Sequence, residues 1–356
     1  LYYNPFFHFK KADKHSQEMQ WPWGSGKTKY KQFTCVLQSE DGIRFTRPEL
    51  GIYDISRFFA DGVDTSDNNV VWTKGTATHN FTPFLDANPD VPPGKRFKAI
   101  ARPPGRNAIE GGALAVYVSP DGFHWALLHD QGFASNPTDS QNAAFWDPNL
   151  ETYVCYKRGK RNGLRDIKRC VSEDLREWSE PTFVTYTDER REHMYTNGIK
   201  PYYRAPHIYI GLPNRFVQSR KKVPEHPHRG VNDTVLMSSR DGIHFDRWEQ
   251  AFLRPGPDPK VWTERNNYIV LGMVQTSPTE ISLYWNEHNR HATSRLRRGT
   301  IRIDGFVSVH AGPEQGEMLT RPFVFGGNQL EVNYATSAIG SVTFELCDVD
   351  GNPING

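Results

Sequence analysis

Four carboxylates lie beside predicted strands, where a fold can hold side chains for acid–base chemistry. Asp139 precedes the apolar run Ala143–Trp146, and Glu110 lies in a glycine-flanked loop. Two carboxyl groups can protonate a leaving oxygen and attack or activate water, which is the chemistry that splits a glycosidic bond. We therefore assign Asp139 as the base or nucleophile and Glu110 as the acid. Asp233 and Glu280, which each begin a predicted strand, are alternative acids.

Two of these carboxylates also have a structural interpretation. Asp139 could cap the loop that follows Pro137, because Asp side chains commonly accept hydrogen bonds from nearby backbone. Glu110 could be an exposed residue of the loop 106–112. Both interpretations stay open at the level of the sequence.

A repeated segment organises the chain around these residues. Four copies of the pattern Ser-x-Asp-x-x-x-aromatic are present, at Ser39–Phe45, Ser119–Trp125, Ser172–Trp178 and Ser239–Phe245. Asp-Gly between alternating apolar residues favours a tight turn, over which the aromatic residue can pack, so each copy predicts a hairpin. The strands before the turns are predicted at Phe33–Leu37, Ala113–Val118, Ile167–Val171 and Thr234–Met237.

Further strand-like runs upstream of most copies give four strands per repeat. A fifth unit without the turn is predicted at Val261–Arg265, Tyr268–Val274, Ile281–Trp285 and Arg297–Ile303. Four-stranded sheets repeated about five times are typical of a β-propeller. We therefore predict an all-β fold, with a five-bladed β-propeller over residues 1–302 whose first blade lacks its innermost strand. The later runs Leu330–Tyr334 and Ser341–Leu346 predict the start of a C-terminal β-sandwich over residues 303–356.

The composition is that of a folded protein without a membrane span or a nucleic-acid partner. Lys and Arg number 43 against 41 Asp and Glu, and the two signs are mixed along the chain, so no basic surface is predicted. Aromatic residues make up 13% of the chain, which is enough apolar area to require a large core. No apolar run reaches the roughly 18 residues that a membrane span needs.

The four cysteines are too few and too scattered for a disulfide scaffold or a zinc site. Cys155 and Cys170 would lie opposite each other in a hairpin centred near Asn162. The sequence leaves open whether they are two free thiols or a cross-strand disulfide.

The five units and their Ser-x-Asp-Gly-x-x-Trp turns resemble the five-bladed β-propeller glycoside hydrolases, the superfamily of invertase, levansucrase and arabinanase-type enzymes. The likeness covers about residues 1–302. Asp139–Asp147, Ser238–Phe245 and Leu296–Phe306 look like a poorly characterised bacterial group of such propellers that carries a C-terminal β-sandwich. The resemblance implies an enzyme that acts on an oligo- or polysaccharide, without specifying the sugar.

One match to the invertase-type signature is set aside. Trp146–Asn149 is similar to the tryptophan-rich stretch whose Asp is the nucleophile in those enzymes, but it falls between two strands of the third unit. Asp-Pro-Asn favours a type I turn there. The family's Arg-Asp-Pro and Glu-Cys motifs are absent, so we do not predict fructan cleavage.

The resemblance further implies a site over the central axis, at the starts of the innermost strands and the loops between second and third strands. The inner-strand starts supply His79, Asn80, Asp139, Gln141, Asn142, Tyr195, Asn197, Trp262 and Arg265. The loops supply Glu110, Arg158, Asp166, Arg215, Asp233 and Glu280. Substrate contacts are predicted for His79, Asn80, Asn142, Arg158, Asn197, Arg215, Trp262 and Arg265. Trp21 and Trp23 are added because indole faces stack well on sugar rings.

Arginines are numerous on the predicted face. They are Arg102, Arg106, Arg158, Arg161, Arg165, Arg215, Arg220 and Arg265. Guanidinium groups suit bidentate capture of carboxylate or sulfate, so an acidic or sulfated glycan is one hypothesis. Pairing of these arginines with local Asp and Glu is the alternative.

Two other motifs receive no function. Gly24–Thr28 is similar to half a P-loop, but the first Gly of that motif would fall at Trp21 and no helix follows. His226 and His228 flank Pro227 in a basic loop, and two histidines in a loop are more often ordinary polar groups than metal ligands, so no metal site is predicted. The sequence contains no recognisable complete set of oxygen ligands for calcium. A structural calcium in the central channel is the one cofactor that we do not exclude.

We therefore predict a glycosidase with a carboxylate acid–base pair and a carbohydrate partner, its oligomeric state undetermined. A non-catalytic glycan-binding propeller would keep the aromatic residues and arginines without the pair. A glycoside phosphorylase would use some arginines to hold phosphate beside a single acid. The chain begins Leu1-Tyr2-Tyr3 and ends at Gly356, so we expect a processed chain or a fragment. An extracellular or periplasmic location is expected from the substrate class alone.

Overall fold

The computed structural model describes residues 2–3, 6–7, 31–56, 62, 64–73, 80–103, 113–129, 133, 140–226, 228–289, 291 and 293–354. Five predicted site residues fall outside them, namely Trp21, Trp23, His79, Glu110 and Asp139. The described chain is built almost entirely of strands, with short 3-10 helices at η3 (Pro93–Lys95) and η4 (Pro259–Val261). The predicted all-β class is therefore confirmed. No helix in this part of the chain is long and apolar enough to cross a membrane.

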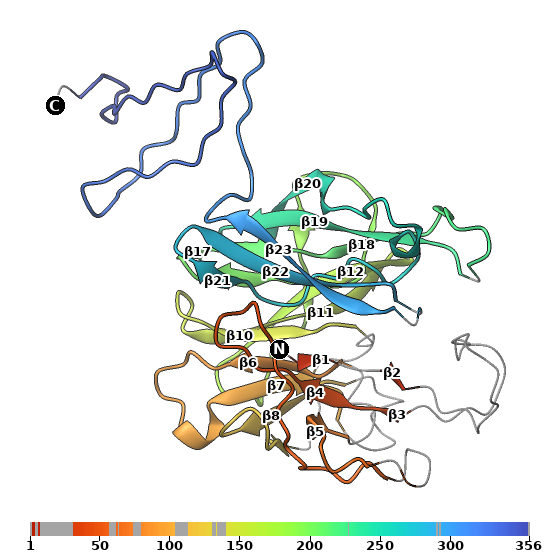
Figure 1. Ribbon diagram of the computed structural model, residues 1–356. Coiled ribbons are helices and arrows are strands. Elements are labelled where there is room, and N and C mark those ends of the chain that lie inside the picture. The colour runs from red at the N-terminus through yellow and green to blue at the C-terminus, as the bar shows by residue number, and fades with distance from the viewer. Residues whose placement is uncertain are drawn as a thin grey trace.

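Five sheets of three or more strands follow one another along the described chain (Figure 1). The first contains β1 (Tyr2–Tyr3), β4 (Thr34–Val36) and β5 (Val70–Trp72), beside the pair β2 (Phe6–Phe7) and β3 (Lys31–Gln32). The second contains β6 (Thr82–Leu85), β7 (Phe97–Ala101), β8 (Ala115–Ser119) and β9 (Ala126–Leu127). The third contains β10 (Ala143–Asp147), β11 (Thr152–Arg161), β12 (Leu164–Ser172) and β13 (Thr182–Phe183). The prediction of four strands per repeat holds for these last two sheets.

The fourth sheet has seven strands, because two of its four strands are interrupted and one short strand pairs in parallel at its edge. Its members are β14 (Thr185–Tyr186), β15 (His193–Met194), β16 (Lys200–Tyr202), β17 (Ala205–Gly211), β18 (Asn214–Val217), β19 (Val231–Ser239) and β20 (His244–Leu253). Strand β19 pairs with β18 over its first half and with β17 over its second half. The break between β17 and β18 falls at Leu212 and Pro213, where proline cannot donate a ladder hydrogen bond.

The fifth sheet contains β21 (Val274–Ser277), β22 (Glu280–Glu287) and β23 (Arg295–Arg302). A bridge between Ile269 and Trp285 extends it toward the preceding chain. The predicted strands at 281–285 and 297–303 are confirmed, but Val261–Arg265 is not a strand. Val261 ends the 3-10 helix η4, which the Asp258 side chain caps by accepting from the Lys260 N–H.

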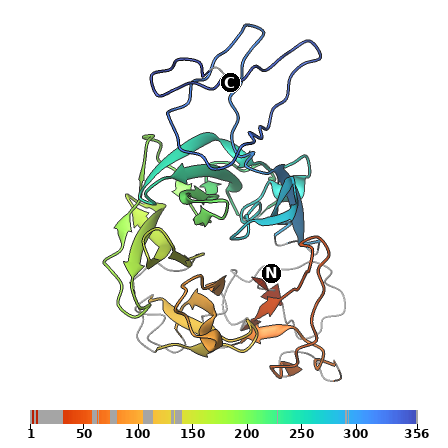
Figure 2. The ribbon, with the colours of Figure 1, turned by 90° about the vertical axis from the view of Figure 1, so that its left-hand side faces the viewer.

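The sheets lie in chain order around a ring, so that the last sheet is beside the first (Figure 2). The Tyr284 hydroxyl on β22 donates to the carbonyl oxygen of Gly42, in the first repeated turn. The Tyr156 hydroxyl on β11 makes the same kind of bond, at 2.7 Å, to Gly242 in the turn of the fourth sheet. The contact that joins neighbouring sheets inside the ring therefore also closes it. This is the architecture of a propeller, and the count of five blades stays a prediction.

The four repeated turns share one hydrogen-bonding pattern. In the second sheet the Ser119 hydroxyl accepts from the Gly122 N–H at 2.9 Å, and Asp121 accepts from Phe123 and His124 at 2.8 and 2.9 Å. The glycines have φ of 69°, 81° and 71° in the first, second and fourth turns, and Leu175 takes 65° at the same place in the third. The side-chain caps thus define the turn, and a glycine is favoured but not required.

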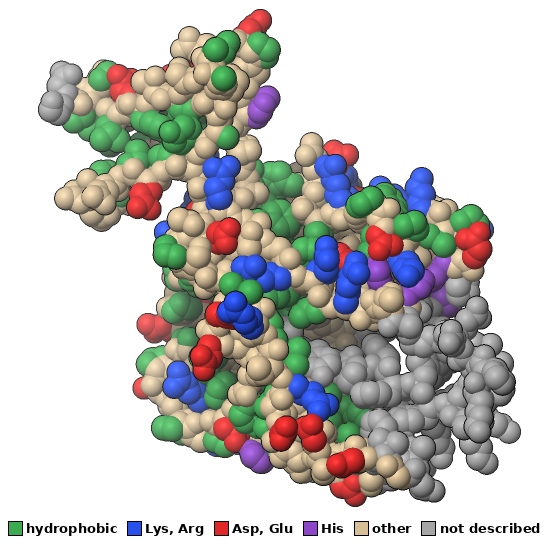
Figure 3. Space-filling model, viewed as in Figure 1, with side chains coloured by type: hydrophobic (Ala, Val, Ile, Leu, Met, Phe, Trp, Pro, Cys, Tyr) green, Lys and Arg blue, Asp and Glu red, His purple; other side chains and the backbone are tan. Residues whose placement is uncertain are grey.

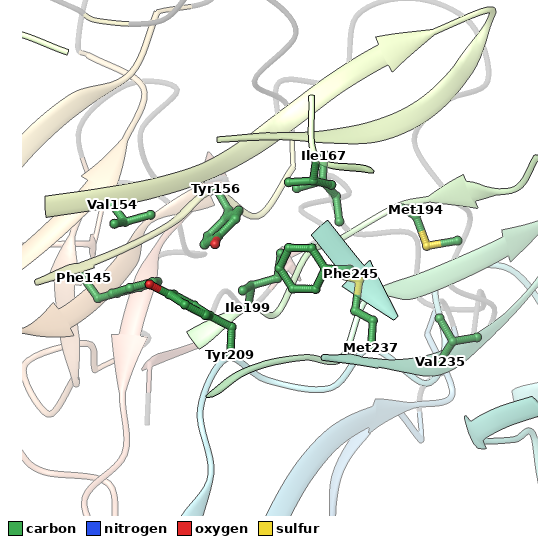
Figure 4. Packing of buried hydrophobic residues seen from close by; sticks show 11 residues of the cluster. Phe145, Val154, Tyr156, Ile167, Met194, Ile199, Tyr209, Val235, Met237 and Phe245 are labelled. Carbon is green, nitrogen blue, oxygen red and sulfur yellow. The ribbon is translucent and has the colours of Figure 1, made fainter. Parts of the chain in front are cut away.

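The core lies between the sheets. The largest cluster joins Phe145, Val154 and Tyr156 of the third sheet to Tyr209 and Met237 of the fourth (Figure 4). These residues alternate along their strands with residues on the opposite side, as the sheet pleat requires. Full burial of such side chains stabilises the fold by roughly 1.5–3 kcal/mol each. Each blade is therefore held mainly by its neighbours.

The β11–β12 hairpin has the longest uninterrupted ladder among the described strands, and it has the predicted register. Cys155 pairs with Cys170, and both are buried free thiols. Its tip is formed by Asn162 and Gly163, with φ of 52° and 79°. Positive φ at both positions is the type I′ turn that Asn-Gly favours, because its twist matches that of the strands.

Two of the expected domain features stay predictions. Tyr2 and Tyr3 pair with Val36 and Cys35, which adds a strand to the first sheet but does not identify an innermost strand. Residues 303–354, which project from the ring, contain no ladder strand among the described residues, and an isolated bridge joins Cys347 to Pro353 (Figure 1). The runs predicted as sandwich strands have no ladder partner there, and their hydrophobic side chains are exposed (Figure 3).

Candidate active site

The inner strands of the third, fourth and fifth sheets begin at one face of the ring, and the loops β11–β12, β18–β19 and β22–β23 lie at that same end of each sheet. Arg158 of β11 donates to the carbonyl oxygen of Tyr195 at 2.8 Å. Asn214 of β18 donates to that of Asn267 at 3.1 Å. Because these bonds join neighbouring sheets, the three sheet ends form one surface, which we call the site face.

Buried asparagines fix the backbone at the site face. The amide of Asn197 donates to the carbonyl oxygen of Gln141 at 3.0 Å, which joins the fourth sheet to the third. Asn232 donates to Asn214, and its own oxygen accepts the N–H of Arg265 at 2.6 Å. Buried polar groups are costly unless they are paired. The network therefore holds the ends of three sheets in one arrangement.

Five side chains meet over this network, and we call them the axial cluster. They are Arg158, Tyr195, Glu264, Arg265 and Tyr268. The Arg158 guanidinium lies 4.5 Å from the centre of the Tyr195 ring, which is 5.5 Å from the Tyr268 ring. Glu264 and Arg265 form an ion pair at 3.3 Å, with side chains 12% and 24% exposed. The cluster is therefore largely shielded from water.

The axial cluster combines one carboxylate with hydrogen-bond donors. Burial raises the pKa of the Tyr268 hydroxyl well above its usual range, and the nearby Tyr195 adds to the effect, so the phenol stays neutral. Its oxygen is buried and has no hydrogen-bond partner among the described residues. A carboxyl group can exchange a proton, and guanidinium and phenol groups can bind oxygen atoms of a ligand. These are the components of acid–base chemistry on a polyhydroxylated molecule.

A second group of cationic and aromatic residues borders the axial cluster. The Arg165 guanidinium lies 4.7 Å from the Tyr195 ring centre and 5.6 Å from that of Phe216. The Arg165 N–H donates to Nδ1 of His193 at 3.1 Å. Partial burial lowers the pKa of His193, and the positive charges of Arg165 and Arg158 lower it further. His193 is therefore neutral at pH 7.

Asp233 is held by a bidentate ion pair. Nε and Nη2 of Arg215 lie 2.8 Å from its two oxygens, and Arg220 lies 3.5 Å away. The Asp233 and Arg215 side chains are only 4% and 9% exposed. Arg215 also bonds Glu192 at 3.0 Å. Both oxygens of Asp233 are occupied, so the geometry favours a structural role over the predicted role of proton donor.

A small pocket of about 20 Å³ opens beside this ion pair. It is lined by Arg161, Asp166, Tyr186, Arg190, Glu192 and Arg247, among others. Most of its charges are paired, since Arg161 bonds Asp166 at 2.6 Å and Arg247 bonds Asp188 at 2.5 Å. This volume holds about one water molecule. The pocket is too small for a sugar ring and is best explained as a joint between sheets.

The structure places several predicted substrate contacts on the site face. Arg158 and Arg265 belong to the axial cluster, while Asn142 and Asn197 are buried in the network beneath it. Asn142 accepts the N–H of Arg158 at 3.3 Å, so it positions an arginine. Their roles toward a substrate stay predictions.

The other described candidates lie at different places. Asn80 lies two residues before the inner strand β6 and is half-buried. Trp262 donates its indole N–H to the carbonyl oxygen of Gly256 at 2.7 Å, which fixes the ring against its own loop. Arg215 is committed to Asp233 and Glu192.

Glu280 lies away from the site face. It begins β22, the second strand of its sheet and not the third, and pairs with Arg302. The end of the sheet next to the axial cluster is instead marked by the pairing of Trp285 with Ile269. The prediction misplaced Glu280 because the fifth unit was given an extra strand at 261–265, which shifted every later strand by one place.

Glu264 and Tyr268 are the functional candidates that sequence reasoning missed. Glu264 immediately precedes the predicted contact Arg265, but it was passed over because 261–265 was interpreted as strand. The available signal was its place before the inner segment of its unit, which matches that of Asp139 in the third unit. His193 was likewise hidden, since nothing in the sequence places it beside Arg165.

The Trp146–Asn149 motif is structural, as predicted. Asp147 is fully buried at the end of β10, and its Oδ1 accepts the N–H groups of Asn149 and Leu150 at 3.0 and 3.3 Å. Its other oxygen accepts the hydroxyl of Tyr209 from the fourth sheet. The strand β10 begins at the site face, so the motif lies at the opposite end.

The described residues contain no group of three or more His, Cys, Asp or Glu side chains arranged to hold a metal ion. His226 accepts the N–H of His228 at 3.3 Å within its own loop. A central calcium therefore gains no support from this part of the chain, and it stays outside our proposals.

Comparison with known proteins supports the fold at low sequence identity. No family model and no curated protein sequence matches the chain. An N-acetylgalactosamine deacetylase from F. plautii aligns with a TM-score of 0.52 and 12% identity, over 85% of this chain and 94% of its own. A beta-1,2-mannobiose phosphorylase from Listeria innocua aligns with a TM-score of 0.52 and 14% identity, over 78% and 69%. The chain thus shares the propeller-type fold of enzymes that process carbohydrates.

Proposed function

We propose that the protein is a carbohydrate-active enzyme that cleaves a glycosidic bond at the site face. The observation that carries the proposal is the position of Glu264, a carboxylate 12% exposed, next to Arg265 and among the aromatic residues of the axial cluster. A shielded carboxyl group with donors around it is what proton transfer to a glycosidic oxygen requires. The shared fold with carbohydrate-processing enzymes supports the same conclusion.

The second carboxylate of the proposal is Asp139. It lies outside the described residues, but it precedes Ser140, whose hydroxyl donates to the carbonyl oxygen of Tyr195 at 2.6 Å. Asp139 is therefore joined in sequence to the residue that contacts the axial cluster. We assign one of Glu264 and Asp139 as the acid and the other as the base or nucleophile. Glu110 stays an alternative for either role.

The test is turnover of a panel of neutral, acidic and sulfated chromogenic glycosides. We expect Glu264→Gln and Asp139→Asn to lower kcat by about 10²–10⁴-fold while glycan binding persists, because acid–base catalysis contributes on this scale. Asp233→Asn serves as the control, since it removes a buried carboxylate of the same face. If both variants turn over substrate like the parent protein, the assignment is wrong.

A glycan-binding protein without activity is the second candidate function. This function is favoured if the parent protein and its variants all bind glycans and none of them releases the chromophore. A phosphorylase is distinguished by turnover that depends on inorganic phosphate and yields a sugar phosphate. In that case the arginines at the site face would serve the phosphate.

A further inference from the structure

Arg165 differs from most other described arginines of the site face in its partners. Arg161, Arg215 and Arg265 each form an ion pair with a carboxylate, at Asp166, Asp233 and Glu264 respectively. Within the described part of the chain, no carboxylate lies at ion-pair distance from Arg165. Its Nε is buried and makes no hydrogen bond there. The alternative explanation of the arginines, local charge pairing, therefore applies to most of the set and fails for this one.

The surroundings of Arg165 supply donors and aromatic faces. The rings of Tyr195 and Phe216 lie within 4.7 and 5.6 Å of its guanidinium. Nδ1 of His193 accepts the Arg165 N–H, so the proton of the neutral imidazole is on Nε2. The imidazole therefore adds a further donor and no further acceptor. A group made of donors, without an acidic partner, is complementary to an oxyanion.

The element that carries Arg165 is rigid. Arg165 pairs with Lys160 in the β11–β12 ladder, close to the type I′ tip at Asn162 and Gly163. The same hairpin carries Arg158, whose guanidinium packs on the Tyr195 ring at 4.5 Å. One aromatic ring therefore connects Arg165 to the axial cluster.

We propose that Arg165 and His193, with the Tyr195 and Phe216 rings, form a subsite for an anionic substituent of the glycan, a carboxylate or a sulfate. The subsite rests on the proposed function, because it assigns a substrate class to the same face. It gives specificity to the enzyme, since a neutral sugar would leave the Arg165 charge without a partner. Free inorganic phosphate has related chemistry and is distinguished by the experiment.

The experiment measures the titration of His193 by NMR in the full chain, with inorganic sulfate, methyl glucuronide, inorganic phosphate or methyl glucoside added. A bound anion opposes the charges of Arg165 and Arg158, so it raises the titration midpoint of His193 by about one pH unit. We expect sulfate and the glucuronide to do this and the glucoside not to do so. In Arg165→Gln, half of the maximal shift in the His193 midpoint should require at least a tenfold higher ligand concentration. Arg165→Lys should retain part of the affinity for the anion.

Arg176→Gln is the matched control. Arg176 is an exposed arginine in the repeated turn at the other end of β12, so its loss removes one positive charge without touching the subsite. An equal loss of response in both variants would indicate general electrostatics and overturn the proposal. A response to phosphate alone, together with phosphate-dependent turnover, would also overturn it in favour of a phosphorylase.

Failure of the subsite and failure of the proposed function give different results. If neutral glycosides are cleaved and no anion changes the titration midpoint of His193, the proposed function is supported and the subsite is contradicted. If methyl glucuronide raises the His193 midpoint only when Arg165 is present, and no glycoside is cleaved, the subsite is supported and the glycosidase proposal is contradicted.

Discussion

How tightly cations hold its oxygens affects whether a carboxylate can exchange a proton with a substrate, and this separates Glu264 from Asp233. Glu264, whose side chain is 12% exposed, contacts Arg265 through Oε2 at 3.3 Å. Asp233 has both oxygens engaged by Arg215 and is almost completely buried. The two residues are chemically similar, yet Asp233 is committed to a bidentate ion pair, and we propose catalysis for Glu264 alone of the two.

This difference predicts opposite phenotypes. Asp233→Asn removes the bidentate carboxylate partner of the buried Arg215 and leaves Glu192 as its remaining counter-charge, so we expect the free energy of unfolding to fall by about 3 kcal/mol. Turnover per folded molecule should be unchanged. Glu264→Gln should have the reverse effect, with stability near that of the parent protein. Urea titration and kcat measured on the same preparations check both. Loss of turnover in folded Asp233→Asn protein would restore Asp233 as a catalytic candidate.

A second prediction at the residue scale concerns Gly242. Gly242 has φ of 71°, and an added Cβ would meet the Tyr156 hydroxyl at 2.7 Å. Gly163 has a similar φ of 79°, but nothing lies within 4 Å of an added Cβ. Gly163→Ala should therefore cost about 1 kcal/mol, the strain of a left-handed residue, and Gly242→Ala clearly more. Thermal denaturation compares the two, and equal losses would contradict the steric explanation.

At the scale of the element, the Asp residues of the repeated turns make the free energy of unfolding depend on pH in acid solution. Backbone N–H groups of Arg44 and Ile43 donate to Asp41 and lower the pKa of its carboxyl to about 2. Backbone N–H groups of Glu177 and Arg176 lower the pKa of Asp174 in the same way. A carboxylate whose pKa is lower in the folded state stabilises the fold above the unfolded value, near 3.8. That contribution is lost as protons bind in the folded state.

We therefore expect the free energy of unfolding to fall as the pH is lowered from about 4 to about 2. Asp174→Asn keeps an acceptor oxygen in the turn but removes its titration, so its stability should depend less steeply on pH over this range. Urea denaturation at several pH values checks the prediction. An unchanged pH dependence in the variant would show that other groups dominate acid unfolding.

At the scale of the whole molecule, ring closure rests on identifiable contacts. The Tyr284 hydroxyl joins the fifth sheet to the Gly42 carbonyl oxygen, and the Phe45 ring packs against the Tyr284 ring with centres 5.6 Å apart. Tyr284→Phe removes one hydrogen bond, so we expect a loss of about 1 kcal/mol in unfolding free energy. Tyr156→Phe removes the matching bond inside the ring. A similar loss in both, measured by urea titration, is expected if closure uses the same contact as the joint between the third and fourth sheets.

A second prediction at this scale concerns how much the C-terminal residues stabilise the ring. Asp304 and Phe306 contact Tyr202 of the ring, whereas the later described residues are mostly exposed. A chain that ends at Gly312 should therefore unfold within a few degrees of the full chain in a thermal scan. A large fall in Tm would show that the segment after Gly312 stabilises the propeller.

Much of the fold could be predicted because its determinants are local. The Ser-x-Asp turns and the Asn162-Gly163 hairpin depend on residues within a few positions of one another, and the register of Cys155 with Cys170 follows from that turn. The fifth unit was predicted less well, since it has no repeated turn. Without that marker, the strand at 261–265 was expected where η4 is found, and Glu280 was placed at the wrong end of its sheet.

The sequence by itself therefore determined the all-β class and the repeated units, whereas the shared face of Arg158 and Arg265 was an implication of the family resemblance. Only the tertiary structure decided which charged groups pair with one another. Arg215 and Asp233 neutralise each other, whereas Arg165 has His193 and two aromatic rings as its neighbours. The physical reason is that strand and turn formation depend on neighbouring residues. Charge pairing depends on distances between residues that the ring brings together from separate sheets.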